Sequence, residues 1–327
     1  MNLIGDHTDY HDGIALPMAI DRDCLAACSG GPDDDLRVHT ADGDDAMLAP
    51  FADAARRVLA ERDHPTVGVL AVASTVPIGA GLASSGALCV AIAGAFDPQL
   101  LVEPMELART ARELEAGATG VPCGLMDQLA SAAGVAGHAL RIDFERSTVD
   151  PIAIPQAIGI VVVHSGLPRV LAAGPYAERR RSSTAVARRL GLRSLRHARP
   201  DQVADEPLAR HVVSENERVD AAAEALRAGD ATTLGALMSA SHASLRDDYS
   251  VSTPELDRLV ELLVHEGAWG ARLTGAGFGG CVIGVAAPER LAAIGTQVAA
   301  RYASETGLTP SVFLPRAADG AGALAWG

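Results

Sequence analysis

Aromatic residues are scarce in this sequence: Phe, Trp and Tyr together make up 3% of its 327 residues. A hydrophobic core with so few large rings has to be built mainly from Ala, Val, Leu and Ile. Hydrophobic residues still account for 48% of the chain and charged residues for 21%, which is typical of a globular protein. Because a chain of this length exceeds the usual size of one hydrophobic core, we expect two domains.

Paired cysteines and long apolar runs are also missing. The five cysteines are odd in number and scattered, which argues against a disulfide framework or a zinc site and predicts free thiols in a reducing cytosol. No apolar run is long enough to span a bilayer, and acidic residues interrupt the N-terminus where a signal peptide would be apolar. We therefore expect a cytoplasmic protein that does not bind membranes.

The sequence also lacks an excess of positive charge. The formal net charge is −14 and the sequence pI is about 5.1. This balance argues against a nucleic-acid partner bound through bulk electrostatics, although it leaves room for a local electropositive site for phosphate. The acidic run at 33–35 is expected to be a solvated loop without a function.

The sequence pattern predicts a mixed α+β protein with domains at 1–152 and 153–327 and a site at their interface. A boundary is expected near the proline-containing segment 149–156. Besides a strand pair around the glycine loop 275–280, strands are predicted at 24–28, 66–74, 139–144, 158–164 and 310–314. Helices are predicted at 51–62, 84–96, 105–116, 125–133, 176–190, 210–228, 232–245, 254–266 and 288–303.

A glycine- and serine-rich segment, VPIGAGLASSGAL at 76–88, follows a predicted strand and opens a predicted helix. Gly79 and Gly81 permit positive φ angles and let backbone N–H groups approach a ligand closely. N–H groups at a helix N-terminus bind anions, although the P-loop pattern is absent here. Taken alone, the segment fits a phosphate loop and a tight turn without a ligand equally well.

Three more segments stand in a fixed order around it: NLIGDHTDYHDG at 2–13, CGLMDQ at 123–128 and LTGAGFGGCVIGV at 273–285. Together the four segments resemble the GHMP family of small-molecule kinases, and the first narrows the resemblance to galactokinases. The resemblance implies a ribosomal S5-like N-terminal domain and a ferredoxin-like C-terminal domain. It also implies ATP-dependent phosphorylation of the anomeric hydroxyl of galactose, giving galactose 1-phosphate and ADP.

The resemblance implies a role for residues around the nucleotide. A kinase needs a carboxylate near the attacking hydroxyl and cations over the transferred phosphate. Asp127 of CGLMDQ would be the catalytic carboxylate, and Ser85 and Glu115 would bind Mg²⁺, with Glu113 as a competing candidate on the same helix. The residues expected around the ATP phosphates are Gly79, Gly81, Ser84 and Ser85.

The first segment is rich in short polar side chains that can hold sugar hydroxyls. By the resemblance, Asp6, His7 and Asp9 face the sugar, Gly124 touches it through its backbone, and Tyr176 contacts it. Galactokinases usually have glutamate at the position of Asp6, so the shorter side chain leaves its contact near the primary hydroxyl to a water molecule or a larger substrate.

Two neighbouring patterns have alternative interpretations. His7 and His11 have the i,i+4 spacing of a metal site, but the glycines around them disfavour the helix that such a site needs. The run 179–181, three arginines after Tyr176, is interpreted as a solvated helix face.

Two positions depart from the family pattern. Ala83 stands where the family has a serine or a glycine, which leaves the metal-binding serine in place. The family also carries an arginine immediately before the NLIG segment, and this chain starts at Met1, inside that motif. Either the start is placed too late or the chain is a variant that has lost catalysis. The presence of Asp127, Ser85 and Glu115 favours the first interpretation.

Three other functions stay open. A related sugar kinase would act on an N-acetylhexosamine, a pentose or a uronic acid. Asp6 supports this alternative, because galactokinases usually have glutamate at its position. A non-catalytic sugar- and nucleotide-binding sensor would bind ATP and galactose without turnover. A mevalonate- or homoserine-type kinase is disfavoured because the HTDY segment suits polyhydroxylated substrates. As for assembly, we expect a monomer or a weak homo-oligomer.

Overall fold

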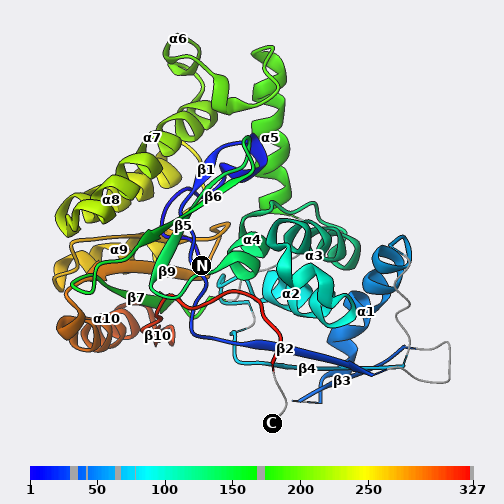
Figure 1. Cartoon of the computed structure of the whole chain (residues 1–327). Helices are drawn as coiled ribbons and strands as arrows, with labels where there is room; N and C mark the ends of the chain where they lie inside the picture. Colours follow the sequence, from blue (N-terminus) through cyan, green and yellow to red (C-terminus); the bar gives the residue numbers. More distant parts are fainter. Residues whose placement is uncertain (30–35, 42, 63–67, 78, 168–173, 325–327) are drawn as a thin grey trace.

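The computed structural model describes residues 1–29, 36–41, 43–62, 68–77, 79–167 and 174–324. Their strands form three sheets, and helices cover these sheets on several sides (Figure 1). We refer to residues 1–152 as the first half of the chain and to the residues after them as the second half. None of the described helices is both long enough and apolar enough to cross a membrane.

The first half contains a sheet in which the middle strand β4 pairs antiparallel with β2 and parallel with β3. The strands are β2 (Cys24–Ser29), β3 (Leu36–Thr40) and β4 (Gly68–Ser74). Four helices pack on this sheet and on one another: α1 (Asp45–Ala60), α2 (Ser84–Phe96), α3 (Pro104–Thr119) and α4 (Met126–Ala133). The small residues of α2 allow it to be buried between its neighbours, as its composition predicts.

A second sheet consists of β1 (Ile14–Ala15), β5 (His138–Asp143) and β6 (Thr148–Ala153), all antiparallel. Strand β6 occupies most of the segment in which a domain boundary was expected. Pro151 suggested a linker, but β6 is an edge strand of its sheet, where a residue without an N–H group is tolerated. The division of the chain at residue 152 stays a prediction.

The third sheet has the order β10-β7-β9-β8 and is antiparallel throughout. Its strands are β7 (Gly159–His164), β8 (Gly270–Thr274), β9 (Cys281–Ala286) and β10 (Ser311–Phe313). With helices between β7 and β8 and between β9 and β10, this is the β-α-β-β-α-β arrangement of the expected ferredoxin-like domain. The helices of this half are α5 (Pro175–Arg189), α6 (Pro200–Val203), α7 (Pro207–Ala228), α8 (Ala231–Asp247), α9 (Pro254–His265) and α10 (Leu291–Thr306).

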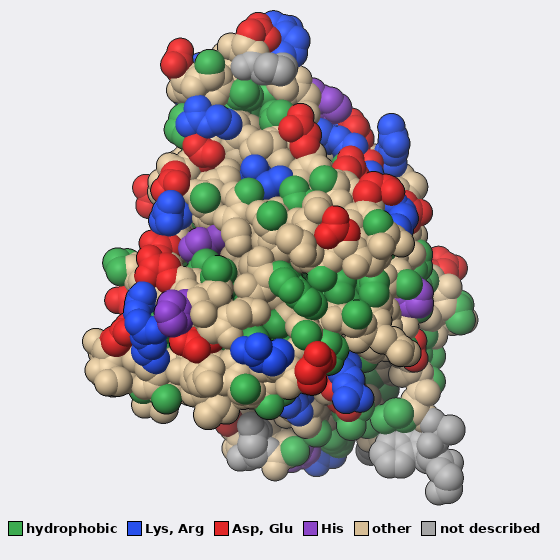
Figure 2. All heavy atoms as spheres, turned by 90° about the vertical axis from the view of Figure 1, so that its left-hand side faces the viewer, with side chains coloured by type: hydrophobic (Ala, Val, Ile, Leu, Met, Phe, Trp, Pro, Cys, Tyr) green, Lys and Arg blue, Asp and Glu red, His purple; other side chains and the backbone are tan. Residues whose placement is uncertain are grey.

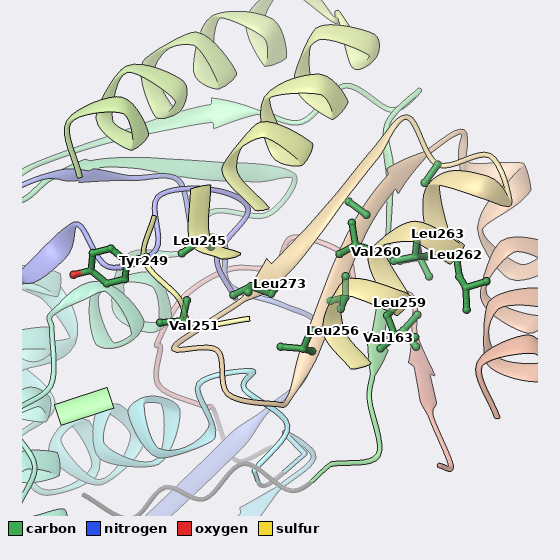
Figure 3. Close-up of a cluster of buried hydrophobic side chains, with 14 of the residues drawn as sticks. Val163, Leu245, Tyr249, Val251, Leu256, Leu259, Val260, Leu262, Leu263 and Leu273 are labelled. Carbon is green, nitrogen blue, oxygen red and sulfur yellow. The ribbon is translucent and has the colours of Figure 1, made fainter. Parts of the chain in front are cut away.

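Side chains alternate between the two faces of a sheet along each strand, and on the third sheet both faces are buried. On β7, Val161 and Val163 point into a cluster with α9 and α10, where the leucines of α9 pack against the strands (Figure 3). The neighbouring Ile160 and Val162 belong to a different cluster, which also contains α8 and the first residues of the chain. This second cluster therefore joins the two halves through a shared hydrophobic core.

The end of the chain also joins the halves. After β10, the chain returns to the first half, where Ala317 pairs with Ile20 and the backbone N–H of Gly320 donates to the carbonyl oxygen of Gly134 just after α4. On the side of α8–α10, arginine and acidic side chains are interspersed on the surface, with hydrophobic side chains among them (Figure 2). Arg258, for example, lies 2.6 Å from Glu305 there.

Most predicted elements are present with shifted ends. The helix expected at 51–62 starts earlier, at Asp45, and contains Pro50. Asp45 accepts a hydrogen bond of 2.6 Å from the backbone N–H of Thr40, which joins the end of β3 to the start of this helix. Strands β1, β3 and β6 were not predicted. The expected acidic loop at 33–35 and the first two residues of the predicted strand 66–74 lie outside the described residues.

Candidate active site

The residues predicted to bind the sugar, ATP or Mg²⁺, together with Asp127, line one cleft, although the segments that carry them are far apart in the chain. The first half contributes the segments 2–13 and 76–88, α3 and the start of α4, and the second half contributes α5 and the loop after β8. The predicted residues in this cleft are Asp6, His7, Asp9, Gly79, Gly81, Ser84, Ser85, Glu115, Gly124, Asp127 and Tyr176. This geometry makes a joint function possible, and the role of each residue stays a prediction.

The loop before α2 has the backbone of an anion cradle. Gly79 and Gly81 have φ angles of +73° and +76°, which glycine adopts without strain. Ala83, the residue before the helix, is also left-handed, with φ 62°. A glycine or asparagine is more usual in this conformation, so Ala83 stores some strain here. The helix then opens with Ser84 and Ser85, whose N–H groups are free of intrahelical partners and can bind phosphate oxygens.

Glu115 and Ser85 form a polar pair beside this cradle. The Ser85 hydroxyl donates a 2.5 Å hydrogen bond to Glu115 Oε1, and Gln128 Nε2 donates to the other carboxylate oxygen. Burial raises the pKa of Glu115, which a nearby cation would counteract. The competing Glu113 is exposed on the other side of α3. An alcohol and a carboxylate in contact fit Mg²⁺, which takes one or two protein ligands besides phosphate oxygens and water.

Asp127 lies in the first turn of α4, where the helix dipole favours a negative charge. It stands next to the phosphate loop because Gly86 has no side chain: a Cβ atom at Gly86 would lie 3.2 Å from the Cβ of Asp127. The charge of Asp127 also raises the pKa values of Asp9 and Glu115, so it acts on both carboxyl groups. The cleft thus brings three carboxylates together between the predicted sugar and phosphate sites.

Asp9 packs directly on Gly124. A Cβ atom at Gly124 would lie 1.4 Å from the Asp9 carboxylate oxygen, so only glycine fits at this position. The backbone N–H of Tyr10 donates to that carboxylate at 3.0 Å. Burial and the charge of Asp127 raise the pKa of Asp9 to about 6, while Arg180 acts in the opposite direction. Asp9 is therefore ionised at neutral pH but protonates in mildly acidic solution.

The Asp6 carboxylate is bound by groups of the protein itself. Arg272, a fully buried residue of β8, donates to Asp6 Oδ2 at 2.5 Å and to the carbonyl oxygen of Leu3 at 3.0 Å. The backbone N–H of Gly275 donates to the other Asp6 oxygen at 3.1 Å. Because both oxygens already have partners inside the protein, this geometry does not support the predicted contact with the sugar. Asp6 instead ties the first segment to the second half.

Helix α7 holds the same segment from the other side. Glu215 accepts hydrogen bonds from the backbone N–H of Gly5 at 3.0 Å and from the hydroxyl of Ser241 at 2.5 Å. Asn216 accepts from the backbone N–H of Ile14 at 2.8 Å. Burial opposes the charge of Glu215, but His211, Arg218 and Arg272 outweigh it and lower its pKa to about 2. The polar segment 2–13 therefore sits in a buried, charged frame.

Three of the four tyrosines of the chain gather around His7. His7 Nδ1 lies 2.7 Å from the hydroxyl of Tyr10, which lies 3.0 Å from the hydroxyl of Tyr249. The Tyr176 ring is 5.9 Å from the His7 ring. Tyr249 is fully buried, and in Figure 3 its hydroxyl points away from the labelled aliphatic side chains. We did not predict Tyr10 and Tyr249 as site residues. Because the chain has so few aromatic residues, each tyrosine could have been considered as a candidate.

Histidine side chains do not converge here as a metal site requires. His11 Nε2 lies 2.8 Å from the hydroxyl of Ser183, whereas His7 faces the tyrosines. Within the ranges that the structure describes, no group of three or more His, Cys, Asp or Glu residues is arranged to hold a metal ion. The i,i+4 metal hypothesis for His7 and His11 is not supported.

The arginine run after Tyr176 is only partly solvated, which corrects its interpretation as a solvated helix face. Arg180 Nη1 donates to the carbonyl oxygen of Pro122 at 2.6 Å, and its guanidinium lies 5.2 Å from the centroid of the Tyr10 ring. Arg181 is exposed. Arg180 is four residues after Tyr176 and thus on the same helix face, a spacing that could have identified it. Residues 168–173, before this helix, lie outside the described residues.

Comparisons with protein families match three regions of the chain. The galactokinase galactose-binding signature matches residues 1–30, the GHMP kinases N terminal domain matches residues 50–135, and the GHMP kinases C terminal model matches residues 222–304. A galactokinase of Roseiflexus sp. (strain RS-1) is 42% identical over 353 aligned residues, which cover 98% of this chain and 90% of that protein.

Solved structures agree with this picture. The crystal structure of Lactococcus lactis galactokinase complexed with galactose matches with a TM-score of 0.89 and 28% identity, covering 98% of this chain and 92% of that one. The L. major mevalonate kinase in complex with R-mevalonate matches with a TM-score of 0.71 and 23% identity, covering 98% and 94% of the two chains. The second likeness shows a shared fold alone.

Proposed function

Because the chain belongs to the galactokinase family of GHMP kinases, we propose that it transfers the γ-phosphoryl group of ATP to the anomeric hydroxyl of galactose. The products are galactose 1-phosphate and ADP. The observation that supports this proposal is that Asp127, the anion cradle before α2 and the polar segment 2–13 line the same cleft. A sugar held on one side and ATP on the other meet at this carboxylate.

In the proposed reaction, Asp127 orients the anomeric hydroxyl and accepts its proton as the oxygen attacks the γ-phosphorus. The new oxygen–phosphorus bond forms while the bond between the γ-phosphorus and the bridging oxygen of ADP breaks. The N–H groups of Ser84 and Ser85 hold the phosphate oxygens at the N-terminus of α2. Such a site accelerates the reaction by positioning and electrostatic stabilisation and forms no covalent intermediate with the protein.

Ser85 and Glu115 are the residues that would hold Mg²⁺. Their contact at 2.5 Å beside the cradle fits a metal that takes few protein ligands. When bound, Mg²⁺ neutralises part of the charge on the phosphates. Glu115 then keeps its negative charge against the burial that raises its pKa, and the Gln128 side chain fixes the orientation of its carboxylate.

On the sugar side, Asp9 is the residue best placed to hold hydroxyl groups. An ionised carboxylate accepts from two vicinal hydroxyls, and Asp9 is ionised at neutral pH because its raised pKa is still only about 6. His7 and Tyr176 line the same part of the cleft, and Gly124 offers its backbone beside Asp9. The Tyr10 hydroxyl, which is itself hydrogen-bonded to that of Tyr249, fixes the ring of His7.

Release of ADP from MgATP in the presence of D-galactose tests the proposal. We expect galactose-dependent release that Asp127→Asn lowers by several orders of magnitude, with KM values for both substrates little changed. Thermal denaturation of both proteins with MgATP and with galactose serves as a binding control, because a ligand that binds the native state raises the Tm. Stabilisation by both ligands without ADP release would replace the kinase proposal by the sensor. Neither stabilisation nor turnover would overturn both.

A second candidate, a kinase for a related sugar, is favoured by the position of Asp6. Its carboxylate is bound to Arg272 and Gly275, so the side of the cleft where it stands does not offer a free carboxylate to a sugar hydroxyl. The same assay with N-acetylgalactosamine, galacturonic acid and L-arabinose separates the candidates. A higher kcat/KM for one of these than for D-galactose would establish the second.

A further inference from the structure

The chain contains 27 arginines and no lysine, so arginine is its basic residue besides histidine. A kinase cleft gathers negative charge, here from Asp9, Asp127 and Glu115 even before ATP binds. Fixed positive charge opposite these side chains has to come from guanidinium groups. Arg180, on α5, is the arginine whose charge acts on Asp9.

Arg180 contacts two segments that come from other parts of the site. Its Nη1 donates to the carbonyl oxygen of Pro122 at 2.6 Å, in the loop between α3 and α4. Its guanidinium lies 5.2 Å from the Tyr10 ring centroid, within the range of a cation–π interaction. A planar guanidinium can stack on a ring and donate in its plane at the same time, which a lysine ammonium cannot.

The loop that Arg180 holds is the one that shapes the sugar site. It contains Gly124, on which the Asp9 carboxylate packs, and it leads into the first turn of α4 with Asp127. Tyr10, on the other side of the guanidinium, directly follows Asp9 and donates its backbone N–H to the Asp9 carboxylate. A shift of either contact of Arg180 would therefore move Asp9 relative to Asp127.

The groups that face Asp9 make the charge of Arg180 important. Asp127 on α4 and the Asp9 carboxylate repel each other, and Arg180 on α5 opposes this repulsion. Four further groups near Asp9 are neutral at pH 7, because burial raises their pKa values still further above 7: Cys123, Tyr10, Tyr176 and Tyr249.

We propose that Arg180 is a positioning residue of the sugar site, which clamps the loop at 121–125 against Tyr10 and balances the charge of Asp9 and Asp127. The inference rests on the proposed function, in which Asp9 holds the sugar hydroxyls. It assigns a role to an arginine that touches neither reacting atom. Its effect should appear in galactose binding and in the titration of Asp9, and not in ATP binding.

Three substitutions at this helix test the proposal. Arg180→Gln removes the charge but keeps a donor, Arg180→Lys keeps the charge but loses the planar fork, and Arg181→Gln makes the same charge change at the exposed neighbour. Because misplacing a binding group by about 1 Å costs roughly 100-fold, we expect Arg180→Gln to lower kcat/KM for galactose by about that factor. The loss should come mainly from KM for galactose, with KM for ATP unchanged. Arg180→Lys should lose less, and Arg181→Gln should match the wild type.

The pH dependence separates a positioning role from a purely structural one. Without the positive charge, the carboxylate form of Asp9 is less stable, so its pKa rises and the acid limb of the activity profile moves to higher pH. Arg180→Lys should keep the wild-type limb. The titration of the Asp9 carboxyl carbon can be followed directly by NMR in protein with ¹³C-labelled aspartate, assigned by the signal that Asp9→Asn removes.

The outcomes distinguish the two proposals. If the wild type phosphorylates galactose but Arg180→Gln and Arg181→Gln share its KM and its Asp9 titration, the role of Arg180 is refuted. An equal loss in KM for galactose and for ATP, with an unmoved titration, would also refute it. If the wild type does not phosphorylate galactose, the proposed function fails, and the NMR titration still shows whether Arg180 controls Asp9.

Discussion

At the scale of single residues, Asp9 is a carboxylate that the fold keeps in a place where ionisation is unfavourable. It is partly buried, packs on Gly124 and faces Asp127, and these surroundings raise its pKa to about 6. A free aspartate titrates about two units lower. This unfavourable ionisation is expected if Asp9 has to be a strong acceptor for sugar hydroxyls, because functional sites often trade stability for activity.

Asp9→Asn is therefore expected to stabilise the protein while it abolishes galactose binding. Between about pH 4 and pH 6 the native Asp9 keeps a proton that the unfolded chain has released, so its contribution to stability falls as the pH rises through this window. Above pH 6 the ionised side chain costs up to about 3 kcal/mol. Urea unfolding at pH 7.5 should show the variant to be more stable by up to this amount, with a smaller difference at pH 4.5. A less stable variant at pH 7.5 would contradict this.

The residue scale also shows what the sequence could and could not reveal about the site. The residues of the four segments were predictable because each segment has a chemical signature in consecutive positions. Arg272 and Tyr249 have no such signature, since they reach the site through the fold. The partner of Asp6 could not be predicted for the same reason, since Arg272 is 266 positions away in the chain. Arg180 was predictable from its spacing to Tyr176, but not its contact with Pro122.

At the scale of elements, the segment 2–13 is held by long-range polar contacts, because η1 (Asp9–His11) is its single turn of regular helix and it needs support from other elements. Strand β8 supplies Arg272 and helix α7 supplies Glu215, both fully buried. A buried ion pair contributes little net stability, but removing one partner leaves the other charge buried and unpaired. The Asp6–Arg272 pair should therefore be strongly coupled.

A double-mutant cycle tests this coupling. Arg272→Met should lower the free energy of unfolding by about 3–5 kcal/mol, because it leaves the Asp6 carboxylate buried without its partner. The double variant Asp6→Asn/Arg272→Met should cost clearly less than the sum of the two single variants, since it removes both charges. Arg258→Met, which breaks exposed ion pairs with Glu305 and Glu261, is the control and should cost at most about 1 kcal/mol. Additive effects in urea unfolding would show that the pair is not coupled.

The elements themselves were predicted unevenly. Long helices such as α2, which is apolar on all sides, and α9, which has one apolar face, lie within a few residues of the expected ends. The short strands β3 and β6 were missed because their pattern is weak and because proline and acidic residues nearby indicated loops. Their pairing with β4 and β5 is a tertiary effect that outweighs local propensity.

At the scale of the whole molecule, the two halves are less separate than two-domain reasoning suggests. They share a hydrophobic cluster that contains Leu3 and Ile4 from the first half and Val162 and Ile283 from the second. The returning end of the chain adds a second connection beside α4, the helix that carries Asp127. An active site between two halves needs such fixed geometry, because small displacements of catalytic groups have large effects on rate. We therefore expect the halves to unfold together.

Gly320 is the point at which this second connection can be tested. A Cβ atom there would lie 2.5 Å from the backbone nitrogen of Gly134 and 2.6 Å from the carbonyl oxygen of Ala132, so Gly320→Ala must push the chain end away from α4. Such overpacking costs about 1–3 kcal/mol. Gly322→Ala is a matched control two residues along, because a Cβ atom there would meet nothing within 4 Å.

In thermal denaturation followed by circular dichroism and calorimetry, Gly320→Ala should lower the Tm of one common transition, and Gly322→Ala should leave it unchanged. The rate of ADP release should fall with Gly320→Ala below the transition as well, because the displaced chain end no longer fixes the C-terminal end of α4. If Gly320→Ala unfolds at the same temperature as Gly322→Ala, the returning chain end is a passive tail. If the transition instead splits in two, the shared hydrophobic cluster alone does not couple the halves, and the chain end is what makes them a single unit.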